Sequence, residues 1–291
     1  MKIITELITP FNKNEIDFVS FNKFIEANNN DYILIFSNYG EGNSLSLEEK
    51  KSLINSINKT YINKIIYYLQ LNNKFCLINI FNYYLQLNNY SLDNQEINLI
   101  NNSNINYVMI SPINNYNYTQ EGLYLYIKKI INLLKNKYII LHNSQLNNNI
   151  NFHFSTISKL IKNNKNIIAL YEEGVDYSLI NLIKNKYKDF KIFVNENLIE
   201  YCLDNNLNGI VSLTSLVLND DLITIIDDYN HHFKNNLLLN YFLFVHEILS
   251  FSNNSTLIKA YLKKLGYQSM DVRLPLLIEK SDIENLDFLL S

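Results

Sequence analysis

Five side chains that can transfer protons or form hydrogen bonds stand at the ends of short apolar runs: Tyr39, Glu41, His142, Tyr171 and Glu172. In a parallel barrel such positions gather at the C-terminal ends of the strands, where barrels of this kind carry their sites. His142 and Tyr171 form a candidate acid/base pair. The alternative is that the two rings fill a pocket and hydrogen-bond locally, without chemistry.

The elements that must position these residues alternate along the chain between β-rich runs and stretches with apolar residues at helical spacing. Eight nearly continuous apolar runs, each followed by a helical stretch, predict an α/β fold with a parallel (β/α)8 TIM barrel. A doubly wound open sheet is the alternative. The candidate strands are Ile3–Ile8, Tyr32–Phe36, Phe75–Ile80, Tyr107–Ile110, Tyr138–Leu141, Ile167–Leu170, Lys191–Val194 and Gly209–Leu213.

Additional C-terminal helices are expected after the eighth unit, near Asn235–Ser250, Ser255–Leu265 and Ser281–Leu290. We predict a single domain over 1–291, with the barrel over about 1–233 and the helical extension over about 234–291. The heptapeptide YYLQLNN occurs at Tyr67–Asn73 and Tyr83–Asn89. Two copies without a continuing period do not make a repeat protein. The first copy is expected to prolong the helix that starts near Glu48.

Composition narrows the function classes. The chain has 291 residues, 47% of them hydrophobic, and a net charge of -3 without a basic stripe or acidic tail. Nucleic acid and membrane surfaces are therefore poor partner candidates. Glycine is scarce and Arg273 is the only arginine, a bias that drift in an AT-rich genome would produce. Cys76 and Cys202 are isolated in sequence and are expected to be buried thiols.

We recognise neither a secretion signal nor a membrane-spanning segment in the sequence. The N-terminus has no long apolar stretch followed by small residues, and apolar runs such as Leu237–Phe251 are interrupted by polar residues. We therefore expect a cytoplasmic protein. His246 with Glu247 lacks the second histidine of an H-E-x-x-H zinc motif, so no metal is predicted.

Short motifs match the pattern of one family, in order, along nearly the whole chain. Each is weak alone, and together, in register with the predicted strands, they are specific: Thr9-Pro10-Phe11, Ser37–Glu41 on G-T-T-G-E, Thr119–Tyr124 on [ST]-Q-E-G-L-Y, Ile139–Asn143 on I-I-L-Y-N, Ile168–Asp176 on G-[IV]-K-E-[AS]-x-G-[ND], Gly209–Ser212 on G-[VI]-I-S and Val272–Leu276 on [VL]-R-L-P-L. The chain resembles the dihydrodipicolinate synthase / N-acetylneuraminate lyase family, and its synthase branch in particular.

This resemblance implies a lyase of lysine biosynthesis, in the diaminopimelate pathway. The family reaction condenses pyruvate with aspartate semialdehyde through a Schiff base between pyruvate and a lysine. No metal or organic cofactor is implied. The resemblance also implies a homodimer or homotetramer.

The reactive positions of the family carry other residues here. Its Schiff-base lysine falls at Tyr171, its relay tyrosine at His142 and its relay threonine at Asn38. A phenol cannot form an imine, so Tyr171 removes the nucleophile of the family route. The substrate-binding positions fall at Tyr39, Gly40, Glu41 and Val211.

Two further family residues are displaced. The relay tyrosine that a neighbouring subunit lends falls at Ile113 or Asn114, with Tyr116 as a replacement, and the arginine for the semialdehyde carboxylate is lost within Gln145–Asn149. Three hypotheses follow. The chain is a dihydrodipicolinate synthase-like protein with an altered site, a catalytically degenerate member that serves as a binding or structural partner in an oligomer, or an enzyme of another class.

Overall fold

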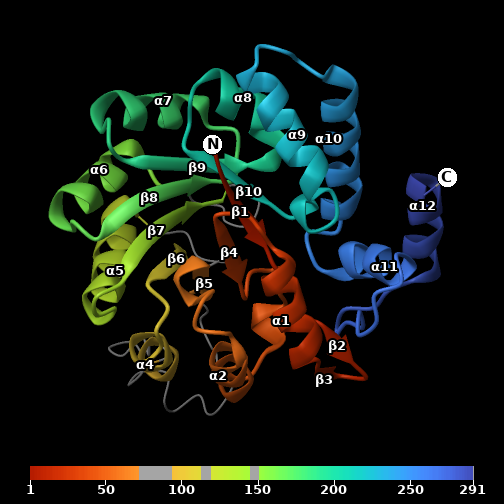
Figure 1. Cartoon of the computed structure of the whole chain (residues 1–291). Helices are drawn as coiled ribbons and strands as arrows, with labels where there is room; N and C mark the ends of the chain where they lie inside the picture. Colours follow the sequence, from red (N-terminus) through yellow and green to blue (C-terminus); the bar gives the residue numbers. More distant parts are fainter. Residues whose placement is uncertain (72–93, 113–118, 145–150, 291) are drawn as a thin grey trace.

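Eight parallel strands close into a barrel in the computed structural model, which describes residues 1–71, 94–112, 119–144 and 151–290 (Figure 1). Each strand is hydrogen-bonded to the next barrel strand along the chain, and β10 pairs with β1 to close the barrel, where Lys2 lies opposite Gly209. The predicted (β/α)8 barrel is confirmed. The strands are β1 (Lys2–Glu6), β4 (Tyr32–Ile35), β5 (Ile65–Gln70), β6 (Tyr107–Ser111), β7 (Tyr138–Asn143), β8 (Ile167–Glu172), β9 (Lys191–Asn195) and β10 (Gly209–Ser212).

The strands are apolar on both faces because both faces are covered. Alternate side chains point into the barrel, and every strand contributes to this inner cluster: Ile4, Leu34, Ile66, Met109, Ile140, Ala169, Phe193 and Val211. The other side chains pack under the surrounding helices in a second, larger core. The two periodicities of strand and helix therefore fix which side chains reach the barrel interior.

Helices surround the strands, and several begin with a capping residue. Ser46 and Glu49 form a reciprocal capping box at the start of α2, and the Thr119 hydroxyl accepts from the Gly122 N–H at 3.1 Å at the start of α5. The described helices of the barrel are α1 (Phe18–Ala27), α2 (Leu47–Ser56), α4 (Asn94–Asn102), α5 (Gln120–Leu133), α6 (Phe154–Asn163), α7 (Tyr177–Lys186), α8 (Ile199–Asp204) and α9 (Asn219–Asn230).

The predicted C-terminal helices are present as α10 (Asn236–Ser250), α11 (Thr256–Lys264) and α12 (Lys280–Leu290). They lie together on one side of the barrel, with α11 near the hairpin of β2 (Phe11–Asn12) and β3 (Glu15–Ile16) (Figure 1). Short 3-10 turns complete the connections: η1 (Gly42–Ser44), η2 (Ile62–Lys64), η4 (Glu196–Leu198) and η5 (Thr214–Leu216).

The predicted third strand, Phe75–Ile80, is wrong. The third strand of the barrel is β5, and 75–80 lies outside the described residues. The helical extension predicted for Tyr67–Asn73 is also wrong where the structure describes it, since α2 ends at Ser56 and Tyr67 to Gln70 belong to β5. The cause is that an apolar run buried on both faces reads alike as strand or buried helix.

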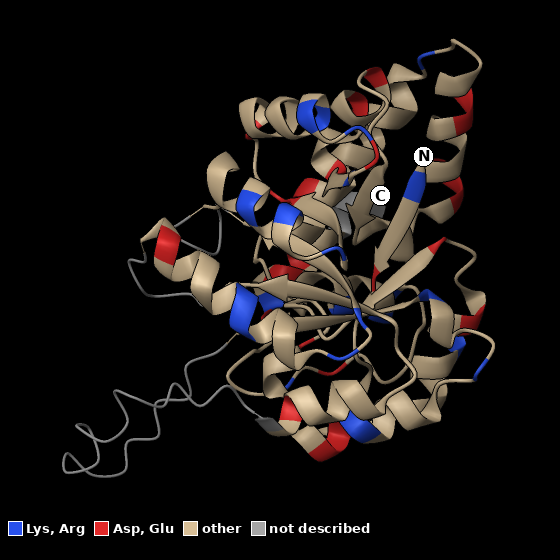
Figure 2. Ribbon diagram, turned by 90° about the vertical axis from the view of Figure 1, so that its left-hand side faces the viewer, with Lys and Arg blue, Asp and Glu red and all other residues tan. Residues whose placement is uncertain are grey.

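The helices carry charged residues of both signs, in keeping with the small net charge (Figure 2). Within the described ranges, no helix combines the length and apolar character needed to span a bilayer. Cys202 is a buried thiol, and burial raises its pKa to about 12. Cys76 lies outside the described residues.

Candidate functional site

A small cavity lies at the C-terminal ends of the strands, which form the mouth of the barrel. Its walls come from strands β1, β5 and β7, from the turn after β4 and from the end of β8. Its volume is about 10 Å³, which is room for about one water molecule. The side chains that line it and carry polar atoms are Glu6, Ser37, Asn38, Tyr39, Tyr68, His142, Tyr171, Glu173 and Asn253. Four of these, Asn38, Tyr39, His142 and Tyr171, are predicted site residues, which the fold thus brings together.

His142 is held at both ring nitrogens. Nδ1 lies 3.2 Å from the Tyr68 hydroxyl and Nε2 lies 3.2 Å from Glu173 Oε2. A neutral ring that donates from Nε2 to the Glu173 carboxylate accepts at Nδ1 from the Tyr68 O–H. The result is a buried hydrogen-bonded chain, Tyr68–His142–Glu173, in which each hydrogen bond polarises the next.

Tyr171 lies beside His142 because the two are paired neighbours on β7 and β8. Their rings stack with centroids 4.7 Å apart and an angle of 11° between the planes. The Tyr171 hydroxyl accepts a hydrogen bond from Asn195 Nδ2 at 3.3 Å. The contact between the predicted acid/base partners is therefore ring packing, and their roles stay a prediction.

The tyrosine hydroxyls around the cavity are neutral at neutral pH. Burial, with the nearby Glu173 and Glu6 carboxylates adding to it, raises the pKa of Tyr171 well above its ordinary value. Burial also raises the pKa of Tyr39 and Tyr68. These groups can donate protons in hydrogen bonds, and none is a phenolate nucleophile.

Glu6 stands at the end of β1 and faces the same cavity. Burial raises its pKa to about 8, and the Glu173 and Glu196 carboxylates act in the same direction, while a hydrogen bond from Ser37 opposes them. At neutral pH a large share of Glu6 is consequently protonated, which makes it a proton donor rather than a fixed charge.

Glu41, predicted to contact substrate, points away from the cavity. Its carboxylate accepts from Ser255 Oγ at 2.6 Å, from the buried Lys259 Nζ and from the Arg273 N–H at 3.3 Å. The preceding Gly40 fits tightly, since a Cβ there would come within 2.9 Å of the Leu7 carbonyl oxygen. These two residues shape the turn that presents Asn38 and Tyr39.

Val211, the last of the predicted binding residues, is buried inside the barrel in the same apolar cluster as the Tyr171 ring. Glu172 faces away from the cavity lining and fixes the loops after β7 and β8. It accepts from Asn143 Nδ2 at 2.7 Å and from the Gly174 N–H at 3.1 Å, and burial raises its pKa to about 7.

Tyr68, Glu6 and Glu173 line the cavity without having been singled out in the sequence. Tyr68 was missed because the third strand was predicted in the wrong place. On β5 the inward positions alternate with outward ones such as Tyr67, whose hydroxyl donates to Glu96 at 2.6 Å. Glu6 could have been found as the last residue of β1, the strand-end rule that identified His142. No metal-ligating group of three carboxylate, histidine or cysteine side chains occurs among the described residues.

Comparison with known proteins gives one consistent answer. The model of the dihydrodipicolinate synthetase family matches residues 106–287, more than half of the chain. The 4-hydroxy-tetrahydrodipicolinate synthase of Karelsulcia muelleri (strain GWSS) is 31% identical, with 96% of this chain and 92% of that protein aligned. The protein of the same name from Thermosipho melanesiensis is 26% identical over 97% of this chain and 94% of that protein.

Solved structures agree on the fold. The dihydrodipicolinate synthase of Bacillus anthracis superposes with a TM-score of 0.84 at 22% identity, covering 99% of this chain and 96% of that one. The Aquifex aeolicus synthase gives a TM-score of 0.83 at 20% identity, again with 99% and 96% covered. By its family model and its full-length relatives, this chain belongs to the dihydrodipicolinate synthetase family.

Proposed function

We propose that this chain acts in lysine biosynthesis, as a cytoplasmic protein at the 4-hydroxy-tetrahydrodipicolinate synthase step. The observation that carries the proposal is the full-length kinship to proteins of that name, from the first strand to the C-terminal helices. The substrates would be pyruvate and aspartate semialdehyde. The proposed assembly is a homodimer or homotetramer.

The chemistry would differ from the family route at its first step. Tyr171 stands where the resemblance places the amine, and no lysine is among the described residues that line the cavity at the mouth. What the site offers is acid–base chemistry through the Tyr68–His142–Glu173 chain. Such a chain can remove a proton from the carbon beside a ketone and return one to an oxygen, two transfers that the condensation requires.

Complementation tests the proposal. The gene is expressed in a diaminopimelate auxotroph that lacks its own synthase, beside the His142→Phe variant and beside an active synthase whose lysine has been replaced by tyrosine. Growth with the native chain, loss with His142→Phe and no growth with the replaced synthase are expected. Growth that His142→Phe leaves unchanged would contradict the role given to this chain of hydrogen bonds.

A second candidate is a catalytically degenerate family member that serves as a binding or structural partner in an oligomer. The size and charge of the mouth favour it. A cavity of about 10 Å³ does not admit pyruvate without movement of the surrounding rings. Glu6 and Glu173 line it without a described lysine or arginine, so a carboxylate substrate meets no opposite charge there.

Trapping of a pyruvate Schiff base, together with the complementation assay, separates the two candidates. Purified protein is incubated with pyruvate and borohydride, and intact mass is compared with that of an active family member treated in parallel. An adduct on any lysine, Lys74 outside the described residues included, means that another amine forms the Schiff base. With no adduct, growth in the complementation assay supports the acid–base route, and absence of growth supports the structural partner.

A further inference from the structure

The floor of the barrel, at the N-terminal ends of the strands, is not filled. A cavity of about 160 Å³ lies there, far larger than the cavity of about 10 Å³ at the mouth. The apolar part of its wall comes from Ile4, Ile66, Ile140, Ala169 and Phe193 on five different strands. The remaining lining residues are Ile168, Tyr32, Tyr107, Asn208, Lys2 and Lys191. Barrels of this class usually fill such layers with bulky branched side chains, so the space needs a local cause.

The cause lies in β8. Pairing with β7 shifts register here, since Ile139 lies opposite Ile167 whereas Ile140 lies opposite Ala169, which leaves Ile168 as an extra residue. A bulge of this kind redirects side chains and occurs often at barrel rims and beside functional sites. It places the small Ala169 on the barrel wall and turns Ile168 toward the floor, where both border the cavity.

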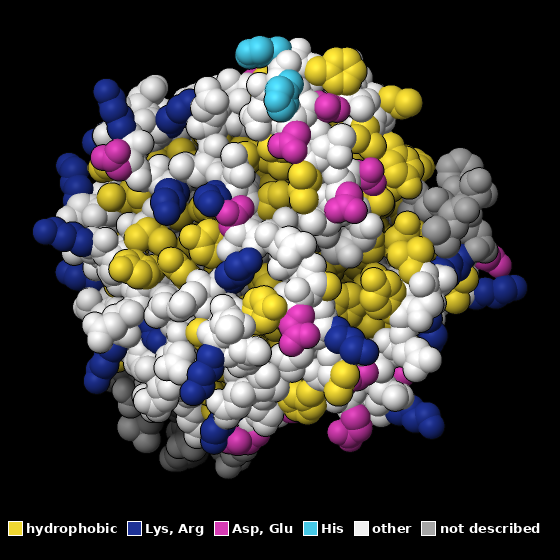
Figure 3. Space-filling model, in the orientation of Figure 1, with side chains coloured by type: hydrophobic (Ala, Val, Ile, Leu, Met, Phe, Trp, Pro, Cys, Tyr) yellow, Lys and Arg dark blue, Asp and Glu magenta, His cyan; other side chains and the backbone are white. Residues whose placement is uncertain are grey.

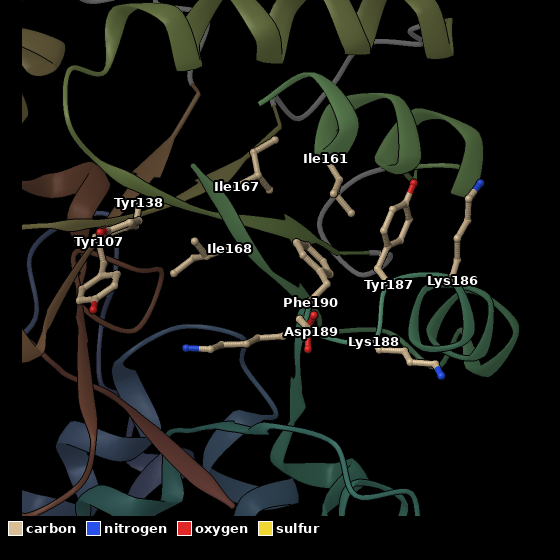
Figure 4. A pocket seen from close by; sticks show the side chains of 11 residues that line it. Tyr107, Tyr138, Ile161, Ile167, Ile168, Lys186, Tyr187, Lys188, Asp189 and Phe190 are labelled. Carbon is tan, nitrogen blue, oxygen red and sulfur yellow. The ribbon is translucent and has the colours of Figure 1, made fainter. Parts of the chain in front are cut away.

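The cavity adjoins an open groove of about 670 Å³. Tyr107, Ile168 and Lys191 line both. Figure 4 shows the groove running from Tyr107 and Tyr138 past Ile168 and Phe190 toward Tyr187 at the end of α7. The floor cavity therefore has an entrance with aromatic walls.

The surroundings of this entrance are positively charged. Lys186, Lys188 and Lys191 line the groove against a single carboxylate, Asp189, and within the described part of the chain none of the three lysines forms an ion pair. Lysine side chains gather on the left of the molecule, the side on which α6 and α7 lie (Figure 3). An anion approaching this face meets a favourable potential.

We propose that the barrel floor binds a small aromatic carboxylate, with the ring inside the cavity and the carboxylate at Lys191. The volume suits the ring, because an apolar protein cavity of about 150 Å³ binds benzene. The charge suits the head group, because Lys191 borders both spaces and lacks a described ion-pair partner. This site is separate from the mouth and independent of the function proposed above.

Ligand-observed NMR and calorimetry test the site with benzoate on the full-length chain. Benzylamine, which has the same ring with the opposite charge, is the matched ligand. We expect saturable benzoate binding, at least about tenfold weaker binding of benzylamine, and about tenfold weaker benzoate binding in Lys191→Gln, while Lys129→Gln on α5 binds as the native chain does.

Ala169→Ile, or Ala169→Val if the larger residue does not give a cooperative thermal transition, fills the cavity and should abolish binding in a folded protein. Absence of saturable benzoate binding, equal binding of benzylamine, or unchanged binding after the cavity is filled would each overturn the proposal. Activity in the complementation assay plays no part in any of these outcomes.

Discussion

The buried ion pair between Lys259 and Glu41 offers a sharp test of how the mouth is held. Lys259 on α11 is 0% exposed and Glu41 is 4% exposed. Besides Glu41, the Lys259 ammonium donates to the Asp271 carbonyl at 2.8 Å and lies 4.3 Å from the centre of the Phe11 ring. The pair ties the turn after β4 to the C-terminal helices. We predict that Lys259→Met strongly destabilises the protein.

The magnitude follows from what the variant leaves behind. Glu41 keeps the Ser255 hydroxyl and the Arg273 N–H as donors but loses its only described cation. Breaking a buried pair by removing one partner costs about 3–5 kcal/mol, against a total stability of about 5–15 kcal/mol for a domain. Glu41 also has φ 51°, a left-handed conformation that costs a non-glycine residue about 1–2 kcal/mol. Glycine would adopt this conformation without the cost, so we infer that the carboxylate of Glu41 compensates for it.

Urea unfolding at about pH 7 measures the change through the midpoint at constant m. Lys263→Met on the same helix is the matched control, because its ammonium is 3.5 Å from Asp271 in an exposed pair and should cost about 0–1 kcal/mol. Glu41→Gln combined with Lys259→Met should recover part of the loss, since no buried charge remains. If Lys259→Met proves as stable as Lys263→Met, the pair does not hold the helices to the barrel.

Three further predictions concern pH, backbone contact and packing. Burial acts to lower the pKa of His246, but the charge of Glu196, its hydrogen bond at 2.8 Å and the charge of Glu247 together raise it, and the pKa of Glu196 is held below its ordinary value although burial opposes this. The stabilisation that the two groups give each other is therefore full between about pH 4.5 and 6.5, and it is lost as pH rises through the folded pKa of His246. Thermal melts should show that His246→Gln loses more stability at about pH 5.5 than at about pH 9. Equal losses at the two pH values would rule the pair out as the cause. Gly209→Ala should cost more than about 2 kcal/mol in urea unfolding, because its Cβ would lie 2.1 Å from the Lys2 carbonyl oxygen at the β1–β10 closure; a loss under about 0.5 kcal/mol would refute the contact. Ala169→Ile should stabilise the protein by about 1 kcal/mol by filling the barrel floor, and a lowered melting temperature would show that the space is not available to a side chain.

Sequence reasoning recovered most strands because their boundaries coincide with polar residues and their interiors are apolar. It failed at β5, where Ile65 to Leu69 is buried throughout and is followed by the asparagine-rich heptapeptide. Periodicity carries no information in a run that is buried on both faces. The same error concealed Tyr68, which the strand assignment would have turned into the barrel.

The site was predictable to the extent that strand ends determine it. His142 and Tyr171 end neighbouring strands, so their proximity follows from topology alone. The direction of Glu41 does not follow, because it depends on a left-handed turn and on Lys259, 218 residues further along the chain. Long-range polar contacts of this kind have no local sequence signal, and only the packed structure reveals them.

The arrangement of buried carboxylates explains how the barrel would persist under the proposed assignment, in which Tyr171 takes the place of the family's lysine. Glu172, Glu196 and Glu41 each join separate segments through several hydrogen bonds, and none of these bonds involves Tyr171 or His142. Buried polar groups that are fully paired sustain a fold, whereas an unpaired one weakens it. Tyr171 adds a neutral ring between His142 and Asn195, and its raised pKa keeps it neutral beside Glu173 and Glu6. The proposed exchange of an amine for a phenol at this position would therefore leave the supporting network intact, and the fold would persist whether or not the Schiff-base chemistry does.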